Sequence, residues 1–419
     1  MTSLDAQARA ILRKNDRGVY TIPTDGLYPY QWNWDSAFAA WGFATFDMPR
    51  AWRELETLMA SQWDDGMVPH IIFHQPDPGY FPGPDVWATG HTPQTTGITQ
   101  PPVAAIIARL IWDLDPQAGR AHLRHLFPAL VRWHRWWHEK RCTQGPATIT
   151  HPWESGRDNS PDWDIGMAGV DGSGVGAYQR CDTGHVDASM RPGKADYDRY
   201  IAMVQFGVGC GWDQDIIVAD GPFLMADPGI TFILLRAHDD LAALGRALGE
   251  DVSEIEGWAA QLRAALPVIW NPDLNAYDAK DMRTGTFAGV LGAGAFLSYL
   301  AGAGRPELDA QLMRVWDGVR YGIPSADPQA DIFDPRRYWR GPTWPVVNAL
   351  LALGFTTSGR TDLEARLRAE TADLIETHGF FEYFDPVDAT PCGGANFTWT
   401  AAIWLTWAGK DRTSTRGAA

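Results

Sequence analysis

The residues of this sequence that could carry chemistry are carboxylates set among aromatic side chains. The segment HPWESGRDNSPDWD, residues 151–164, holds Glu154, Asp158, Asp162 and Asp164 in a stretch broken by glycine and proline. Turn formation explains most of the four, because an aspartate side chain bonds its own backbone. One of them in a tryptophan-lined pocket would be partly desolvated, and its pKa would rise as a general acid at neutral pH requires.

A second carboxylate stands among aromatic residues near the other end of the chain. In GFFEYFDP, residues 379–386, Glu382 is flanked by phenylalanines and a tyrosine. Its side chain either reaches solvent or is held in a site, and the local sequence favours neither. Two such carboxylates fit glycoside hydrolysis, in which one protonates the leaving oxygen and the other activates water or attacks the sugar.

Two aromatic segments could form the wall of a sugar-binding pocket. The chain has 21 tryptophans, and tryptophan offers a flat, apolar, donor-bearing surface that suits the C–H face of a sugar ring. YPYQWNWDS (28–36) interleaves aromatic residues with amides and Asp35, and RRYWRGPTWP (336–345) interleaves them with arginines. The alternative for the first segment is a packed turn in which Asp35 caps the following helix. We interpret it as part of a pocket.

No metal or cofactor site is predicted. His134 and His138 stand four residues apart, a spacing that can ligate a metal, but no nearby acid or cysteine completes the set. This pair, like His122 and His125, therefore predicts a solvated helix face. The sequence has no HExxH, GxSxG, P-loop or GxGxxG motif. Its four cysteines form no CxxC pair and are expected to be free thiols.

Length and charge exclude several classes of protein. The 419 residues carry a formal net charge of -16, which argues against nucleic acid and anionic membranes as partners. No apolar run approaches the ~18–20 residues of a membrane span, and the N-terminus does not resemble a signal peptide. We expect a soluble cytoplasmic protein with a small-molecule partner. The sequence leaves open whether it forms a homo-oligomer.

Helical patterns dominate the elements that must position these residues. Apolar residues recur at helical spacing over 106–114, 130–137, 234–248, 255–266, 346–351, 367–374 and 397–407. About eleven to thirteen helices are expected, with little strand. Long loops separate them at 64–100, 142–195, 272–288, 320–343 and 379–396, and loops of this length are usually functional. The pattern predicts one domain of paired helices with these loops gathered at one end.

Taken together, the motifs resemble those of glycoside hydrolase family 63. The branch that they resemble most contains the small bacterial hydrolases of mannosylglycerate and glucosylglycerate. The matching stretches run in family order along nearly the whole chain: YPYQWNWDSAF (28–38), GMVPH (66–70), TGITQPP (96–102), PWESGRDNSPDWD (152–164), DTGHV (182–186), RPGKADYDRY (191–200), RYWRGPTWPVVN (337–348), FEYFDP (381–386) and FTWTAA (397–402).

The resemblance implies an all-α fold, an (α/α)6 barrel formed by residues 1–419 as a single catalytic domain. It implies an inverting α-glycosidase that needs no metal or organic cofactor. The family's general acid falls on Asp158 and its general base on Glu382. Inversion needs room for a water, so the two carboxyl groups are expected roughly 6.5–9.5 Å apart.

The resemblance also implies the substrate-binding residues. Tyr28, Trp32, Trp34 and Asp35 would surround the sugar ring, with Asp35 holding hydroxyl groups. A carboxylate aglycone such as glycerate would be bound by Arg191, whose guanidinium can pair with a carboxylate in bidentate fashion; a surface ion pair is the alternative for this arginine. The remaining wall and aglycone positions are Tyr80, Gln100, Trp153, Tyr197, Tyr338, Trp339 and Trp344.

Two departures from the family pattern keep other substrates open. Residues 387–396, VDATPCGGAN, and the glycine-rich stretch 166–176 differ from what the glycerate-specific branch predicts. Either could reshape the aglycone subsite. An α-glucosidase or trehalase-like enzyme acting on short neutral oligosaccharides is the alternative, and a non-catalytic carbohydrate-binding protein is a third possibility.

Overall fold

Helices form most of the molecule. The computed structural model describes residues 3–180 and 182–409, and eleven α-helices of eleven residues or more lie in this part of the chain. They are α1 (Leu4–Asn15), α2 (Asn33–Phe43), α3 (Met48–Ala60), α5 (Ala104–Leu114), α6 (Pro116–Trp136), α8 (Lys194–Gly209), α10 (Pro228–Leu248), α11 (Ser253–Ala265), α13 (Pro306–Asp317), α14 (Pro345–Thr357) and α15 (Thr361–His378). These eleven lie within the predicted eleven to thirteen, and five shorter α-helices bring the total in the described residues to sixteen.

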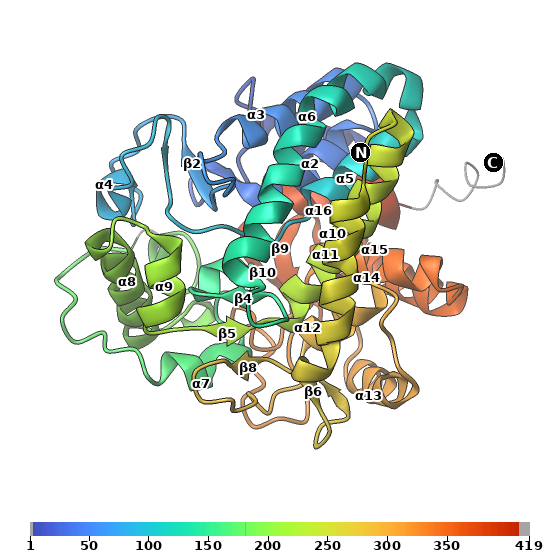
Figure 1. Ribbon diagram of the computed structural model, residues 1–419. Coiled ribbons are helices and arrows are strands. Elements are labelled where there is room, and N and C mark those ends of the chain that lie inside the picture. Colours follow the sequence, from blue (N-terminus) through green and yellow to red (C-terminus); the bar gives the residue numbers. More distant parts are fainter. Residues whose placement is uncertain (1–2, 181, 410–419) are drawn as a thin grey trace.

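Most of the long helices pack against one another around one core. Helix α2 lies against α3 and against α16 (Thr398–Ile403), α10 lies against α11 and α5, and α14 lies against α15. Figure 1 shows these helices as one bundle. On one side of it lie α8 and the short helices α4 (Pro84–Trp87) and α9 (Gln214–Asp220), with the loops that join them. The short helices α7 (Asp164–Met167) and α12 (Ala293–Phe296) lie in the lower part of that view.

Strands are short, as the sequence predicts, and they pair between segments that lie mostly in the long loops. The first sheet joins β1 (Gln31–Trp32), β2 (Ile71–Phe73) and β3 (Gln94–Thr95), with Gln31 opposite Ile72. The second pairs β9 (Phe381–Phe384) with β10 (Pro391–Ala395). The others join β4 (Thr148–Ile149), β5 (Met225–Ala226) and β8 (Lys280–Asp281), and β6 (Trp270–Asn271) with β7 (Ala276–Tyr277). All these pairs are antiparallel.

The histidine pair His134 and His138 is not on a solvated face, so that prediction is wrong. His134 is fully buried in α6 and His238 is fully buried in α10, because the two helices pack together. Nδ1 of His238 lies 2.7 Å from Nδ1 of His134, and its Nε2 lies 2.8 Å from Nε2 of His138. His238 uses opposite nitrogens, so the three rings form a hydrogen-bonded chain and not a converging set of metal ligands. Burial lowers the pKa of His134 to about 3, so this ring is neutral at neutral pH.

The predictions for His122, His125 and three of the four cysteines are met. His125 is exposed, and His122 is part-exposed beside Glu56. Cys142, Cys210 and Cys392 are free thiols, whereas Cys181 lies outside the described residues. Across residues 3–180 and 182–409, no group of three or more His, Cys, Asp or Glu side chains is arranged to hold a metal.

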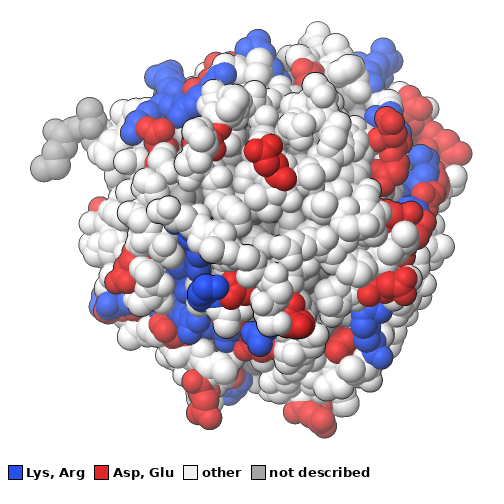
Figure 2. Space-filling model, turned by 90° about the vertical axis from the view of Figure 1, so that its left-hand side faces the viewer, with Lys and Arg blue, Asp and Glu red and all other residues white. Residues whose placement is uncertain are grey.

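The surface carries side chains of both charges (Figure 2). None of the described helices is both long and apolar enough to cross a bilayer. Figure 2 shows acidic and basic side chains mixed around the margin of one face, whose centre is largely uncharged. The basic side chains on that face lie in small groups beside acidic ones (Figure 2).

Candidate active site

One cavity collects the residues that the sequence singled out. The cavity opens to solvent, and the empty space in it, open solvent included, is about 830 Å³. Four of the five long loops contribute to it, and residues 272–288 do not. The predicted site residues that line it are Tyr28, Trp32, Trp34, Asp35, Tyr80, Gln100, Trp153, Asp158, Arg191, Tyr197, Tyr338 and Glu382.

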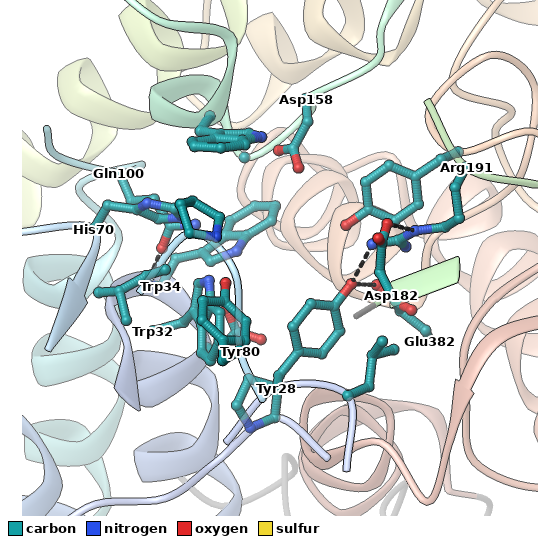
Figure 3. Close-up of a pocket in the computed structure, with 18 of the residues that line it drawn as sticks. Tyr28, Trp32, Trp34, His70, Tyr80, Gln100, Asp158, Asp182, Arg191 and Glu382 are labelled. Carbon is teal, nitrogen blue, oxygen red and sulfur yellow. Dashed lines mark hydrogen bonds and ion pairs between the residues drawn. The ribbon is translucent and has the colours of Figure 1, made fainter. Parts of the chain in front are cut away.

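The aromatic wall begins in the segment 28–36. Trp32 lies on β1, and its ring meets Tyr28 and Tyr80 edge to face at centroid distances of 5.1 and 5.8 Å. Figure 3 shows these rings on one side of the cavity. Edge-to-face packing holds each ring in a defined orientation, so the wall is rigid before a ligand arrives.

The amides of the same segment point away from the cavity and into the scaffold. The Gln31 amide donates to Oε1 of the fully buried Glu54, and its carbonyl oxygen lies 2.6 Å from Nε2 of His74. Asn33 donates to the backbone oxygens of residues 68 and 69. Glu54 also accepts from Ser36 and forms an ion pair with Arg50. In this segment Tyr28, Trp32 and Trp34 therefore line the cavity, whereas the two amides lie behind it.

Asp35 does not cap helix α2. The acceptor at the start of this helix is Oε1 of Gln100, which receives the Trp34 N–H at 3.2 Å. The Asp35 carboxylate is consequently left beside the cavity, 6% exposed. Burial raises its pKa well above the usual range, and the charges of Glu382 and Asp158 raise it further.

Asp158 lines the cavity on a segment that buried hydrogen bonds hold in place. Burial raises the pKa of its carboxyl group to about 7, and the positive charge of Arg191 opposes part of that rise. The preceding residues form a 3-10 turn, Pro152–Ser155. Glu154 of this turn is fully buried and accepts from the backbone N–H groups of Thr99 and Thr150 and from Arg141. The segment that carries Asp158 is thus fixed by a buried acceptor.

Glu382 lies on β9 and is surrounded by hydrogen-bond donors. The Tyr28 hydroxyl donates to Oε1 at 3.1 Å, and the Gly394 N–H donates to Oε2 at 3.0 Å. Burial raises the pKa of Glu382, whereas Arg191 and these donors act in the opposite direction. Donors and a nearby cation favour the charged carboxylate, so they offset part of the effect of burial.

A glycine makes room for this carboxylate. Strand β10 has a register shift between Cys392 and Ala395, and within it Gly393 has a φ of +71°. A Cβ on Gly393 would come within 2.3 Å of Oε2 of Glu382. The stretch 391–395, which departs from the family pattern, therefore includes a residue that Glu382 requires to be glycine.

Arg191 connects the two sides of the site. Its Nε donates to Asp182 at 3.0 Å, its Nη2 donates to the Tyr28 hydroxyl at 2.9 Å, and its guanidinium lies 4.1 Å from the ring centre of Tyr338. Only 7% of it is exposed, so the surface ion-pair alternative does not hold. Its Nη1 is buried without a hydrogen-bond partner among the described residues. Figure 3 shows the hydroxyl end of Tyr28 pointing toward both Arg191 and Glu382.

Trp339 and Trp344 do not line the cavity, contrary to prediction. They stack on each other at a centroid distance of 3.7 Å, and each is almost fully buried. Trp34 and Tyr383 contact this pair from opposite ends. The two tryptophans therefore form a layer behind the wall.

Sequence reasoning also missed residues that line the cavity. His70, Asp182, Phe397 and Trp399 belong to quoted family motifs, so a signal for them existed, whereas Trp87 had none. Burial, and then the nearby His151, lowers the pKa of His70 well below its usual range, so this ring is neutral. The full set of missed residues is Pro23, Leu27, His70, Ile71, Phe81, Pro82, Trp87, Gly156, Asp182, Pro192, Phe397 and Trp399.

Comparison with known proteins gives the same grouping. A family model for the mannosylglycerate hydrolase MGH1-like glycoside hydrolase domain matches residues 28–400. The mannosylglycerate hydrolase of Thermus thermophilus is 43% identical over 96% of this chain and 99% of its own. The glucosylglycerate hydrolase of Mycolicibacterium hassiacum is 35% identical over 97% of this chain and 98% of its own. A crystal structure of a family 63 mannosylglycerate hydrolase from Thermus thermophilus, in complex with Tris and D-glycerate, superposes with a TM-score of 0.93 and 42% identity, covering 97% of this chain and 100% of that one. The chain belongs to the MGH1-like glycoside hydrolases of family 63.

Proposed function

We propose that this enzyme hydrolyses glucosylglycerate or mannosylglycerate with inversion at the anomeric carbon. We also propose that residues 1–419 form one catalytic domain, an (α/α)6 barrel. One observation carries the proposal: two carboxyl groups in different electrostatic surroundings, Asp158 and Glu382, line one aromatic cavity together with the buried cation of Arg191. Pairs of acids whose surroundings differ in this way divide the acid and base roles between them.

The proposed reaction has one step. Protonated Asp158 donates its proton to the glycosidic oxygen as the bond from that oxygen to the anomeric carbon breaks. A water attacks that carbon from the opposite face and loses a proton to Glu382. The products are the sugar of inverted configuration and the free alcohol of the aglycone. Asp35 would accept hydrogen bonds from hydroxyl groups of the sugar, and Trp32 and Trp34 would pack against the sugar ring.

Arg191 would select the acidic aglycone. It is a buried cation that lines the cavity, and a guanidinium binds a carboxylate strongly when both are desolvated. Relatives that are named for mannosylglycerate and glucosylglycerate hydrolysis support this reading. The sugar and the aglycone of this enzyme both belong to the proposal.

Arg191→Ala should discriminate between acidic and neutral substrates. Loss of a charged hydrogen bond is worth about 1.5–3 kcal/mol, so kcat/KM for the glycerate glycosides should fall by about 10- to 150-fold more than for a neutral α-glucoside. Both substrates should lose some kcat, because Arg191 also holds Tyr28 beside Glu382. The measurement is a panel of kcat/KM values with and without a carboxylate aglycone.

Arg180→Ala is the matched control. Arg180 binds the same carboxylate, Asp182, through Nε and Nη2, but it does not line the cavity. It should therefore leave the preference for acidic substrates in place. An equal loss on acidic and neutral substrates in Arg191→Ala would remove the proposed role and would favour an enzyme for neutral oligosaccharides.

A further inference from the structure

Next to Asp158, the side chain of Arg157 points the other way, into the core. Residues 157 and 158 lie outside any helix or strand, so no regular structure sets the direction of the Asp158 side chain. Arg157 is 3% exposed, and its Nη1 and Nη2 donate to Asp162 at 2.5 Å and to Asp227 at 2.6 Å. The guanidinium fills a fitted space, because a Cβ on Gly294 would come within 2.7 Å of Nη1.

The two carboxylates on Arg157 tie it to different parts of the molecule. Asp162 follows the acid in the same loop and also accepts from the Ser160 hydroxyl at 2.9 Å. Asp227 caps α10 by accepting the Gly229 N–H at 2.7 Å. The loop that bears Asp158 is thereby anchored to the start of a long helix of the core.

The peptide oxygens on both sides of this position are also held. The indole N–H of Trp163 donates to the carbonyl oxygen of Arg157 at 2.8 Å. The hydroxyl of Tyr200 donates to the carbonyl oxygen of Asp158, also at 2.8 Å. Tyr200 is 2% exposed and belongs to α8. The backbone of the acid is therefore fixed from one side by its own loop and from the other by a separate helix.

Stability alone does not account for this arrangement, because burying a cation with two anions usually adds little stability compared with apolar packing. The ion pairs do give the loop a defined geometry. Geometry matters for catalysis, since displacement of a reacting group by about 1 Å can cost about 10²-fold in rate. We propose that Arg157 and Tyr200 are positioning residues that aim the carboxyl group of Asp158 at the glycosidic oxygen. This inference rests on the proposed role of Asp158 as the general acid.

A leaving group that needs no proton separates this role from a structural one. Fluoride departs without protonation, so hydrolysis of the α-glycosyl fluoride should not depend on where the acid points, whereas hydrolysis of the glycerate glycoside should. In Arg157→Lys and Tyr200→Phe, we expect kcat for the glycerate glycoside to fall about 10- to 100-fold, with KM little changed. For the glycosyl fluoride of the same sugar, kcat should fall less than about 3-fold, because water and Glu382 remain in place.

Two reference variants show what loss of the acid and what a change remote from the site do to each substrate. Asp158→Asn should show the same selectivity in stronger form. Arg360→Lys changes a two-pronged pair with Asp309, at 2.7 and 2.9 Å, whose residues do not line the cavity, and it should leave both substrates unaffected. Tyr200→Phe removes one hydroxyl group and serves as the folded test if Arg157→Lys does not fold.

The outcomes keep the two proposals apart. If Arg157→Lys and Tyr200→Phe slow both substrates by the same factor, while Asp158→Asn spares the fluoride, the positioning role is overturned and the function stands. If Asp158→Asn itself loses the fluoride and the glycoside equally, Asp158 is not the acid and the proposed mechanism fails.

Discussion

Replacing Glu382 by alanine is expected to abolish hydrolysis almost completely and to leave the protein folded. Removal of a general base costs up to about 10⁴-fold in kcat, and this carboxylate has no substitute on the opposite side of the sugar. Its hydrogen-bond donors, Tyr28 and Gly394, would face a space where water can take the place of the carboxylate. The measurement is single-turnover hydrolysis of the glycerate glycoside, with the unfolding transition as a check on folding.

Azide distinguishes a lost base from a damaged fold. The space left by Glu382→Ala can admit this small nucleophile, which needs no base because it carries no proton. With the α-glycosyl fluoride as substrate, azide should restore turnover and yield the β-glycosyl azide. Glu382→Gln keeps the shape and fills the space, so it should be as inactive as the alanine variant but should not respond to azide. Near-normal turnover in either variant would show that Glu382 is not the base.

Asp158→Asn should lower kcat for the glycerate glycoside by about 10³- to 10⁴-fold, the upper part of the range for acid catalysis. The acid must carry its proton, and its pKa is about 7, so kcat/KM of the unchanged enzyme should fall tenfold per pH unit above that value. This alkaline limb should be absent from the residual activity of the variant. A profile that keeps the limb in Asp158→Asn would assign it to another group.

The same raised pKa makes a prediction about stability with a defined sign. An unfolded aspartate titrates near 3.9, so between there and about pH 7 the folded protein holds a proton that the unfolded chain has released. Folding stability therefore falls as pH rises through this window, and the full cost of the buried carboxylate is present above it. Asparagine carries no such cost, so Asp158→Asn should unfold at a higher temperature than the unchanged protein above pH 7. A lower unfolding temperature would contradict the raised pKa.

Local patterns predicted the helices well, because an apolar stripe at helical spacing needs no knowledge of its partners. The chemistry of segment 28–36 was predicted only in outline. Three of its four aromatic residues line a cavity, but Gln31 and Asn33 face the scaffold, since Glu54 and two backbone oxygens lie behind them. The partners of a polar side chain are set by distant segments, which a local pattern does not contain.

Trp339 and His134 show the same limit. Trp339 stands in an arginine-rich aromatic motif but packs against Trp344 in the core. Whether such a residue lines the cavity or lies behind it depends on how far it is from the cavity, and the local motif does not specify that distance. His134 has the spacing of a metal ligand or of a solvated face, yet α10 covers it and supplies His238 as its partner. Cytoplasmic location and oligomeric state stay predictions.

Proton NMR of a fresh reaction tests the central claim most directly. Hydrolysis of α-glucosylglycerate or α-mannosylglycerate by the unchanged enzyme should first release the β-anomer of the free sugar, which then mutarotates to the equilibrium mixture. Early accumulation of the α-anomer would contradict a water-mediated single displacement between Asp158 and Glu382, and absence of any free sugar from either compound would contradict the proposed substrates.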